Sequence, residues 1–218
     1  MIDLTKQKDV FVLRLQAGQN ALNPDLIGAI HAALDEVEGS SGPAALVTTG
    51  VDKYYCYGLD LPWMKKNKYS PREIAPLIHS VLERLIVFPM ITVGAINGHV
   101  FGAGAILSLA HDYRIMREDR GYWCLPEVDI GMGFPPASCH LLTSLLSTGT
   151  AREAMVTGRR FDAAAALAGG IATHTATMDD LLDKSVTLAQ QHAAKDRQAV
   201  GSIKKNLFTP VLAPFSSD

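Results

Sequence analysis

Residues 91–116 read ITVGAINGHVFGAGAILSLAHDYRIM, and this stretch decides the fold. The apolar run at 90–96 is typical of a buried strand, and Asn97-Gly98 is a common turn dipeptide. The pattern then predicts a helix over 103–110, followed by a second strand over 113–116. A strand, a helix and a further strand form a crossover unit, so this stretch predicts neighbouring parallel strands in one sheet.

The same alternation of strands and helices extends toward the N-terminus. Strands are expected over 10–15 and 44–49, where short apolar runs occur. Between them, Asn23 can cap a helix whose first turn contains Pro24, and a further helix is expected near 71–87. The sequence therefore predicts an α/β fold with a largely parallel sheet.

The composition of the chain changes near residue 140. The predicted strands lie before this point, whereas residues 139–195 are expected to be mostly helical. We therefore expect an α/β core over 1–140 and a short helical C-terminal region over 141–218. The sequence shows neither an internal repeat nor a low-complexity linker.

The overall composition excludes several classes of protein. Hydrophobic residues make up 48% of the 218 residues and charged residues 19%, which excludes a disordered chain. The formal net charge of -2 disfavours a nucleic-acid partner. No apolar run approaches the about 20 residues that a membrane span requires. The three cysteines form no CxxC pair, so we expect a reducing compartment and no metal site.

The residues at the two ends of the sequence do not match common targeting signals. The N-terminal residues MIDLTKQKDV lack the apolar run of a signal peptide, and residues 216–218 are not a peroxisomal address. We therefore expect a cytoplasmic protein. The basic block KKNK at 65–68, together with Arg72, is either a solvated surface or an anion site, and both readings stay open.

Two glycine-bearing loops can present backbone N–H groups. Gly102, Ala103 and Gly104 stand where a loop enters the predicted helix, and helix N-termini carry unpaired N–H donors. The alternative reading of these small residues is close packing between a helix and a strand. In KYYCYGLDLPWM, residues 53–64, Asp60 can cap a helix and the N–H of Leu59 lies at its start. Two such loops can converge on one carbonyl oxygen and form a two-donor oxyanion hole.

A third stretch supplies a candidate base. Glu127 lies between Pro126 and Val128 in CLPEVDIGMGFPP, residues 124–136. A carboxylate held against apolar surface has a raised pKa, as a general base near neutral pH requires. Asp129 is the nearest competing acid, and a surface acid in a loop is the alternative reading of Glu127.

With these stretches in register, the chain resembles the crotonase superfamily, the enoyl-CoA hydratase/isomerase family. The resemblance covers about residues 10–175 and rests on five motifs in order: NALNPDL at 20–26, YGLDL at 57–61, the stretch at 91–116, PEVDIG at 126–131 and TGRRFDAAAALAGGI at 157–171. It implies a crotonase-like spiral core of ββα units with a helical C-terminal part. It also implies a homotrimer or hexamer, in which the C-terminal helices contribute to oligomer contacts and close the site.

The resemblance assigns roles to individual positions. The backbone N–H groups of Leu59 and Ala103 would be the oxyanion donors, and the two catalytic acids of the family would fall at 106 and 127. Position 106 is isoleucine, which cannot hold a water, so the resemblance implies Glu127 as the single acid. The substrate-binding residues that it implies are Ala21, Leu22, Tyr57, Gly58, Leu59, Gly102, Ala103 and Phe134. Trp63 and Met64 are further candidates for pocket walls.

A single acid fits migration of a double bond. Glu127 would remove a proton from C2 of a 3-enoyl-CoA and return it to C4, so the resemblance implies a Δ3-Δ2-enoyl-CoA isomerase of fatty acid metabolism and β-oxidation. The substrate carries the coenzyme A, so no cofactor and no metal is expected. The alternatives are a weak hydratase, a thioester hydrolase, a decarboxylase, or a non-catalytic acyl-CoA-binding relative or assembly partner. Pro135 stands where the family's dehalogenases carry an aspartate, which disfavours that reaction.

Four other polar or reactive side chains lie near these motifs without a recognisable chemical partner. His99 and His111 flank the central stretch, and neither has a paired nucleophile. Cys56 precedes the first loop and lacks a base. We expect these three residues to be structural, and we expect Asp112 to anchor a turn or the start of a strand.

Overall fold

The computed structural model describes residues 1–213. These residues form a six-stranded sheet in the order β1-β2-β3-β5-β7-β9 and a three-stranded sheet in the order β4-β6-β8. The strands of the large sheet are β1 (Ile2–Gln7), β2 (Val10–Leu15), β3 (Ala45–Thr49), β5 (Thr92–Ile96), β7 (Tyr113–Arg117) and β9 (His174–Ala176). Only β1 runs antiparallel to its neighbour in this sheet, so the predicted parallel sheet is confirmed.

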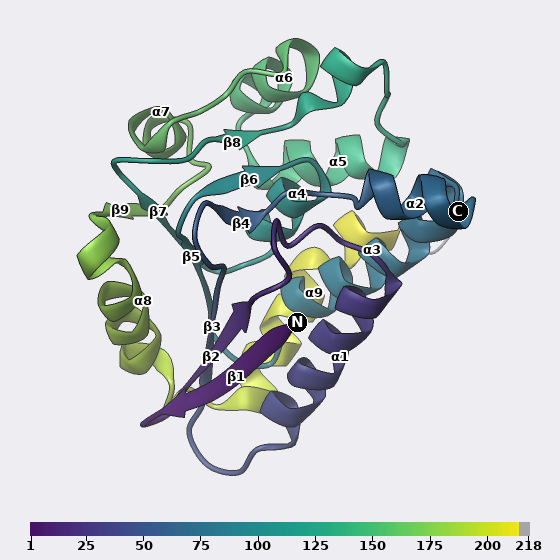
Figure 1. Ribbon diagram of the computed structural model, residues 1–218. Coiled ribbons are helices and arrows are strands. Elements are labelled where there is room, and N and C mark those ends of the chain that lie inside the picture. The colour runs from purple at the N-terminus through teal and green to yellow at the C-terminus, as the bar shows by residue number, and fades with distance from the viewer. Residues whose placement is uncertain (214–218) are drawn as a thin grey trace.

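The chain winds through a repeated ββα unit. From β3 to β8, one strand of each unit joins the large sheet, the next strand joins the small sheet, and one or more helices return the chain (Figure 1). The small-sheet strands are β4 (Tyr54–Cys56), β6 (His99–Phe101) and β8 (Trp123–Cys124). This is the spiral that the resemblance implied. The short strands of the small sheet and strand β1 were not predicted.

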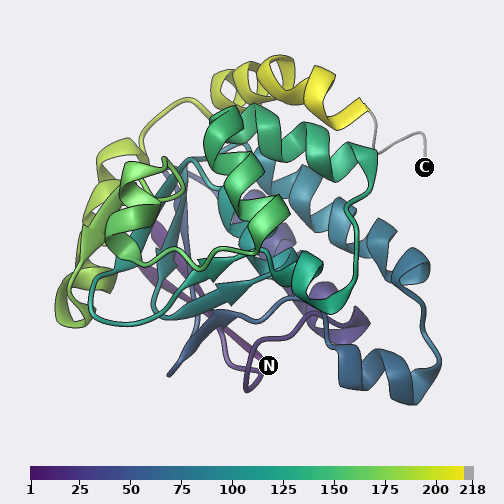
Figure 2. The same ribbon diagram turned by 90° about the horizontal axis from the view of Figure 1, so that it is seen from above.

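Helices cover both faces of the large sheet. Helices α1 (Pro24–Gly39), α3 (Pro71–Ile86) and α9 (Arg197–Leu212) lie on one side, and α8 (Met178–His192) lies on the other (Figures 1 and 2). Strand β2 shows why: Phe11 and Leu13 belong to the core on the α1 side, whereas Val10 and Val12 belong to the core under α8. The alternation of side chains along a strand thus supplies two apolar layers.

Short helices join these layers. They are α2 (Leu61–Asn67), α4 (Ala103–Leu109), α5 (Pro136–Leu145), α6 (Thr148–Thr157), α7 (Ala163–Ala168) and the 3₁₀ helix η1 (Pro126–Ile130). Two predicted caps are confirmed: Asn23 Oδ1 accepts a hydrogen bond from the Leu26 N–H at 3.0 Å, and Asp60 Oδ1 accepts one from the Trp63 N–H at 3.0 Å. Each cap pairs an N–H that the first turn of a helix leaves free.

The described part of the region 141–218 is largely helical, and its one strand is β9. Its contacts cross the expected division at residue 140, because β9 pairs with β7 and α8 packs against five strands of the large sheet. The expectation that residues 216–218 are not a peroxisomal address concerns residues outside the described part of the chain. Within 1–213, no helix combines the length and apolarity needed to cross a membrane.

A buried ion pair ties α9 to the sheet. Asp112 Oδ2 accepts hydrogen bonds from the Thr92 N–H at 2.8 Å and from Lys204 Nζ at 2.6 Å, and Lys204 Nζ also donates to Met90 O at 2.8 Å. The Lys204 side chain is 8% exposed and that of Asp112 is 24% exposed. Burial lowers the pKa of Lys204, while Asp112 opposes this. Asp112 therefore anchors the start of β5, as predicted.

Lys204→Met is expected to lower the free energy of unfolding by about 2 kcal/mol, because it leaves the Asp112 carboxylate without its cation in a half-buried position. Urea unfolding followed by circular dichroism measures this difference. The control is Lys205→Met on the next, exposed residue, which is expected to change stability by less than about 0.5 kcal/mol. Equal stabilities of the two variants would show that the pair contributes nothing.

Candidate active site

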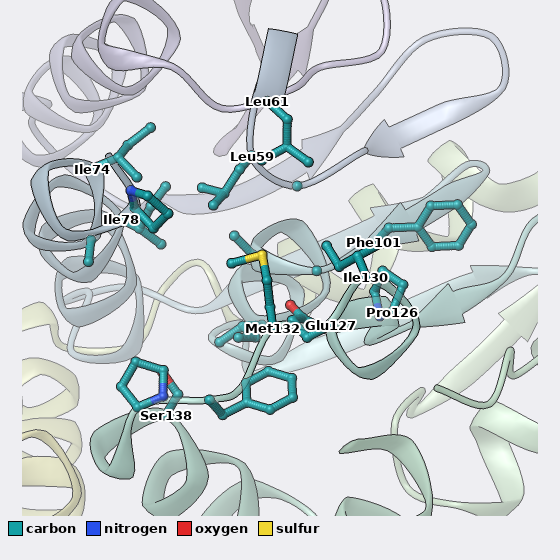
Figure 3. Close-up of a pocket in the computed structure, with 18 of the residues that line it drawn as sticks. Leu59, Leu61, Ile74, Ile78, Phe101, Pro126, Glu127, Ile130, Met132 and Ser138 are labelled. Atoms are coloured by element: carbon teal, nitrogen blue, oxygen red, sulfur yellow. The ribbon is translucent and has the colours of Figure 1, made fainter. Parts of the chain in front are cut away.

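A cavity of about 360 Å³ lies where the loops after β4, β6 and β8 meet α3. Figure 3 shows its walls, with Leu59 and Leu61 on one side, Ile74 and Ile78 of α3 on a second side, and Glu127 opposite Leu59. Most of the lining side chains are apolar. Such a cavity accepts an apolar molecule and presents a few polar groups to it.

The first loop holds a free backbone donor at Leu59. Gly58 has φ +90°, a conformation that favours glycine. The Leu22 N–H donates to Gly58 O at 2.7 Å and the Asp60 N–H donates to Leu22 O at 3.0 Å, so the loop is fixed on both sides of Leu59. Within residues 1–213, the N–H of Leu59 has no hydrogen-bond acceptor. It is therefore available to a ligand in the cavity.

The second loop holds a free donor at Ala103. Gly102 has φ +54° and ψ −127°, and its N–H donates to Cys124 O at 3.0 Å. Ala103 is the first residue of α4, and its N–H has no acceptor in the described part of the chain. A Cβ at Gly58 would lie 3.4 Å from Ala103 N, so the two loops touch. The two loops that carry these donors therefore lie side by side, an arrangement that an oxyanion hole requires.

Close packing explains one of the small residues at 102–104, namely Gly104. A Cβ on Gly104 would lie 2.5 Å from Cys56 Sγ and 2.8 Å from Cys56 O. Only glycine lets α4 approach β4 so closely. Both readings of the small-residue stretch are therefore present: Gly104 serves packing, and Gly102 and Ala103 shape the loop that faces the cavity.

Glu127 supplies the acid of the cavity. It lies in η1, and its Oε2 atom is buried without a hydrogen-bond partner among the described residues. Its Oε1 atom would lie 3.3 Å from a Cβ on Gly102, which places the carboxylate beside the second loop. Burial raises the pKa of Glu127, while a hydrogen bond from its own backbone opposes this. A half-buried carboxylate with a raised pKa is suited to accept and return a proton.

The cavity has no second carboxylate at either candidate position, Asp129 or Ile106. Asp129, the competing candidate, faces α6: a Cβ on Gly158 would lie 2.9 Å from Asp129 Oδ2. Glu127 is the only carboxylate that lines the cavity within residues 1–213, and Ile106 lines it as an apolar side chain. One carboxylate and two N–H donors are therefore the polar groups with a clear chemical use here.

The structure brings most of the predicted site residues together. Tyr57, Gly58, Leu59, Gly102, Ala103, Glu127 and Phe134 all line the cavity. Ala21 and Leu22 do not line it. Leu22 is 1% exposed in the core and holds the first loop through its backbone, and the expected contact of both residues with coenzyme A stays a prediction. Trp63 packs against Tyr69 and Met64 is buried in the core, so neither is a cavity wall.

Some lining residues were not predicted. The face of α3 that carries Ile74, Ile78 and His79 lines the cavity, as do Met132 and Arg160. The α3 residues recur at helical spacing, and this pattern could have indicated a wall as well as a core face. The basic residues at 65–68 are exposed on and just after α2 and do not line the cavity.

The predicted structural residues are not part of the cavity lining. Cys56 Sγ donates to Asn20 O at 3.1 Å, and burial raises the pKa of its thiol to about 12. His99 packs against Phe101 and Tyr122 on the small sheet. His111 is buried, and burial lowers its pKa to about 4. No group of three or more metal-ligating side chains occurs within residues 1–213.

Comparisons with known proteins show which family the chain resembles. The profile of the family described as Enoyl-CoA hydratase/isomerase matches residues 5–214. Enoyl-CoA delta isomerase 2, peroxisomal, of Arabidopsis thaliana is 33% identical over 95% of this chain and 92% of its own length. A probable enoyl-CoA hydratase of Mycobacterium leprae is 29% identical over 94% of this chain and 85% of its own length. The structure of an enoyl-CoA hydratase/isomerase family protein from Pseudomonas syringae superimposes with a TM-score of 0.91 at 25% identity, covering 99% of this chain and 94% of that one.

Proposed function

The chain belongs to the enoyl-CoA hydratase/isomerase family, and from this membership we propose that it is a Δ3-Δ2-enoyl-CoA isomerase. The family makes the chain a crotonase-superfamily enzyme that acts on acyl-CoA thioesters. The relatives are named both isomerase and hydratase, so the reaction has to be argued from the site.

The observation that carries the proposal is the single carboxylate. Hydration of a double bond must hold a water and move protons to and from it, which in this family is the work of two acids. Here Glu127 lines the cavity and the other position is Ile106, which has neither donor nor acceptor. Double-bond migration requires one group that takes a proton from C2 and returns it to C4, and Glu127 suffices for that.

The two N–H donors have a defined task in this reaction. Removal of the C2 proton from a 3-enoyl thioester places negative charge on the thioester oxygen. Hydrogen bonds from the Leu59 and Ala103 N–H groups would stabilise that charge, each by about 3 kcal/mol. Glu127, beside the second loop, would hold the proton between the two steps. The apolar wall of α3 would contact the acyl chain.

The test offers trans-3-hexenoyl-CoA and 3-dodecenoyl-CoA to the purified protein and follows the 2-enoyl and 3-hydroxyacyl products by chromatography. The proposal expects the 2-enoyl product from at least one substrate, with hydration of added 2-enoyl-CoA slower by at least about 100-fold. Binding of both thioesters without any 2-enoyl product would reject it and favour a hydrolase, a decarboxylase or a non-catalytic acyl-CoA-binding protein.

The raised pKa of Glu127 gives this activity a pH dependence. The base is active when ionised, so kcat/KM is expected to fall as the pH falls through the pKa of Glu127, with a midpoint above the ordinary value of 4.5. A kcat/KM profile between pH 4 and pH 8 measures it, with circular dichroism at each pH to separate loss of activity from unfolding. A midpoint at or below 4.5 would contradict the assignment of Glu127 as the base.

Several sequence-based expectations accompany the proposal and stay predictions. They are the homotrimer or hexamer, the cytoplasmic location, and a reaction that needs neither metal nor added cofactor. A role in fatty acid metabolism is supported by the enoyl-CoA relatives.

A further inference from the structure

A chain of hydrogen bonds between buried polar groups lies beneath the two donor loops. Tyr55 Oη lies 2.7 Å from Thr48 Oγ1, which lies 2.8 Å from His111 Nε2, and His111 Nδ1 lies 3.1 Å from Ser108 O. All four residues are buried, with exposed fractions of 6% or less. Burying a polar group lowers the stability of the fold unless the group is hydrogen-bonded. The presence of four such residues in one chain of hydrogen bonds therefore suggests a role for that chain.

The donors and acceptors of this chain are fixed. Ser108 O is a carbonyl oxygen, so His111 Nδ1 must donate to it. Burial lowers the pKa of His111 to about 4, so the imidazole is neutral near pH 7 and Nε2 is an acceptor. Thr48 Oγ1 therefore donates to Nε2 and accepts from the Tyr55 hydroxyl. Only this arrangement of donors and acceptors pairs every group of the hydrogen-bond chain.

This chain of hydrogen bonds joins the strands and the helix that carry the proposed site residues. Tyr55 lies in β4, four residues before Leu59. Ser108 lies in the last turn of α4, the helix that begins at Ala103, and His111 follows two residues after the helix ends. Thr48 lies in β3, so both donor loops are tied to the large sheet.

A branch of the same chain reaches the strand before the base. Ser108 Oγ accepts a hydrogen bond from Trp123 Nε1 at 3.1 Å, and it donates to Ala105 O at 2.6 Å. Trp123 is 0% exposed and lies in β8, four residues before Glu127. The polar chain therefore contacts the element that leads to each of the three proposed functional groups.

We propose that Thr48, Tyr55 and His111 are positioning residues, which set the spacing between the N–H donors of Leu59 and Ala103 and hence their hydrogen bonds to the thioester oxygen. The inference rests on the proposed function in that it takes this pair of N–H groups to be the oxyanion hole. None of the three side chains lines the cavity, so they would act through the loops and not on the substrate. A shift of about 1 Å in a reacting group is enough to slow a reaction severely.

Thr48→Val is the central variant, and the chain offers a matched control in Thr49→Val. Both threonines lie in β3 and are buried, with exposed fractions of 6% and 5%. Thr49 Oγ1 donates to Ala95 O at 3.0 Å and does not belong to the polar chain. Each variant removes one buried hydroxyl and its hydrogen bonds with little change of shape, so a general loss of stability affects both.

The kinetic readout separates positioning from structure. Thr48→Val is expected to lower kcat by about tenfold with KM changed by less than about threefold, whereas Thr49→Val is expected to keep kcat within about twofold. Thr48→Ser retains a hydroxyl and is expected to restore kcat to within about threefold of the native value. Equal losses of kcat in Thr48→Val and Thr49→Val would overturn the proposal.

A spectroscopic readout tests the same idea without turnover. Octanoyl-CoA labelled with ¹³C at the thioester carbonyl has no double bond to move, and donated hydrogen bonds shift its carbonyl stretch to lower frequency in infrared difference spectra. The shift is expected in the native protein and in Thr49→Val, and a smaller shift is expected in Thr48→Val. Tyr55→Phe, which removes only the terminal hydroxyl, is expected to reduce the shift in the same direction and serves if Thr48→Val does not fold.

The spectra also separate this inference from the proposed function. A bound thioester whose carbonyl is not shifted in the native protein, or is shifted equally in the Thr48 and Thr49 variants, would overturn the inference. A native shift that Thr48→Val reduces would support it even if no 3-enoyl-CoA is isomerised, and in that case the proposed function alone would fail.

Discussion

Glu127→Gln is expected to lower kcat for double-bond migration by about 10³-fold, within the range that positioned proton-transfer groups contribute. The amide keeps the size of the carboxylate but cannot take the proton from C2. Glu127 lines the cavity, so the amide of the variant would occupy the same wall. Formation of the 2-enoyl product from 3-dodecenoyl-CoA measures kcat, and calorimetric binding of dodecanoyl-CoA, which cannot be isomerised, is expected to change by less than about threefold.

Asp129→Asn is the matched control for that variant. Asp129 belongs to the same 3₁₀ helix, is exposed, and faces Gly158 of the α6 terminus. Its replacement is expected to keep kcat within about twofold. If Glu127→Gln retained more than a tenth of kcat, or if Asp129→Asn lost as much, the proton shuttle would have to be a different group.

The positions of the two donor loops could be predicted from the sequence, because these loops depend on backbone conformation. Gly58 and Gly102 both have positive φ, which few other residues adopt, so the glycines indicated where the chain leaves N–H groups uncovered. The cap at Asp60 was visible for a similar reason, because an acceptor side chain must precede the free N–H groups of a helix. Features with such a local requirement can be read from single residues.

Features that depend on distant contacts could not be read in that way. Strands β6 and β8 have three and two residues, too few to show a period of two, and they exist because β4, β6 and β8 pair with one another. The cavity wall on α3 has the same spacing as a core face, and only tertiary packing decides that Ile74 and Ile78 border a cavity. The side chain of Leu22 lies in the core and its backbone holds the loop of Leu59, and both contacts join segments that lie far apart in the sequence.

Gly58→Ala is expected to lower kcat by about 10²-fold, the loss associated with one oxyanion-hole donor. Two effects act together at this position. The φ of +90° is strained for alanine, and the new Cβ would lie 2.8 Å from Phe101 O. Because Phe101 O is a backbone atom, the first loop must move away from the second, and the N–H groups of Leu59 and Ala103 can no longer reach one oxygen.

Gly170→Ala separates strain from displacement of the loop. Gly170 has φ +73°, yet a Cβ there meets nothing within 4 Å, and the residue lies outside the cavity lining. It is expected to lose about 1 kcal/mol of stability, as Gly58→Ala does from strain alone, and to keep kcat within about twofold. The carbonyl stretch of bound ¹³C-labelled octanoyl-CoA should lose its shift only in Gly58→Ala. A folded Gly58→Ala protein with native kcat would show that the contact between the two loops does not create the oxyanion hole, and the roles of both N–H groups would then fall together.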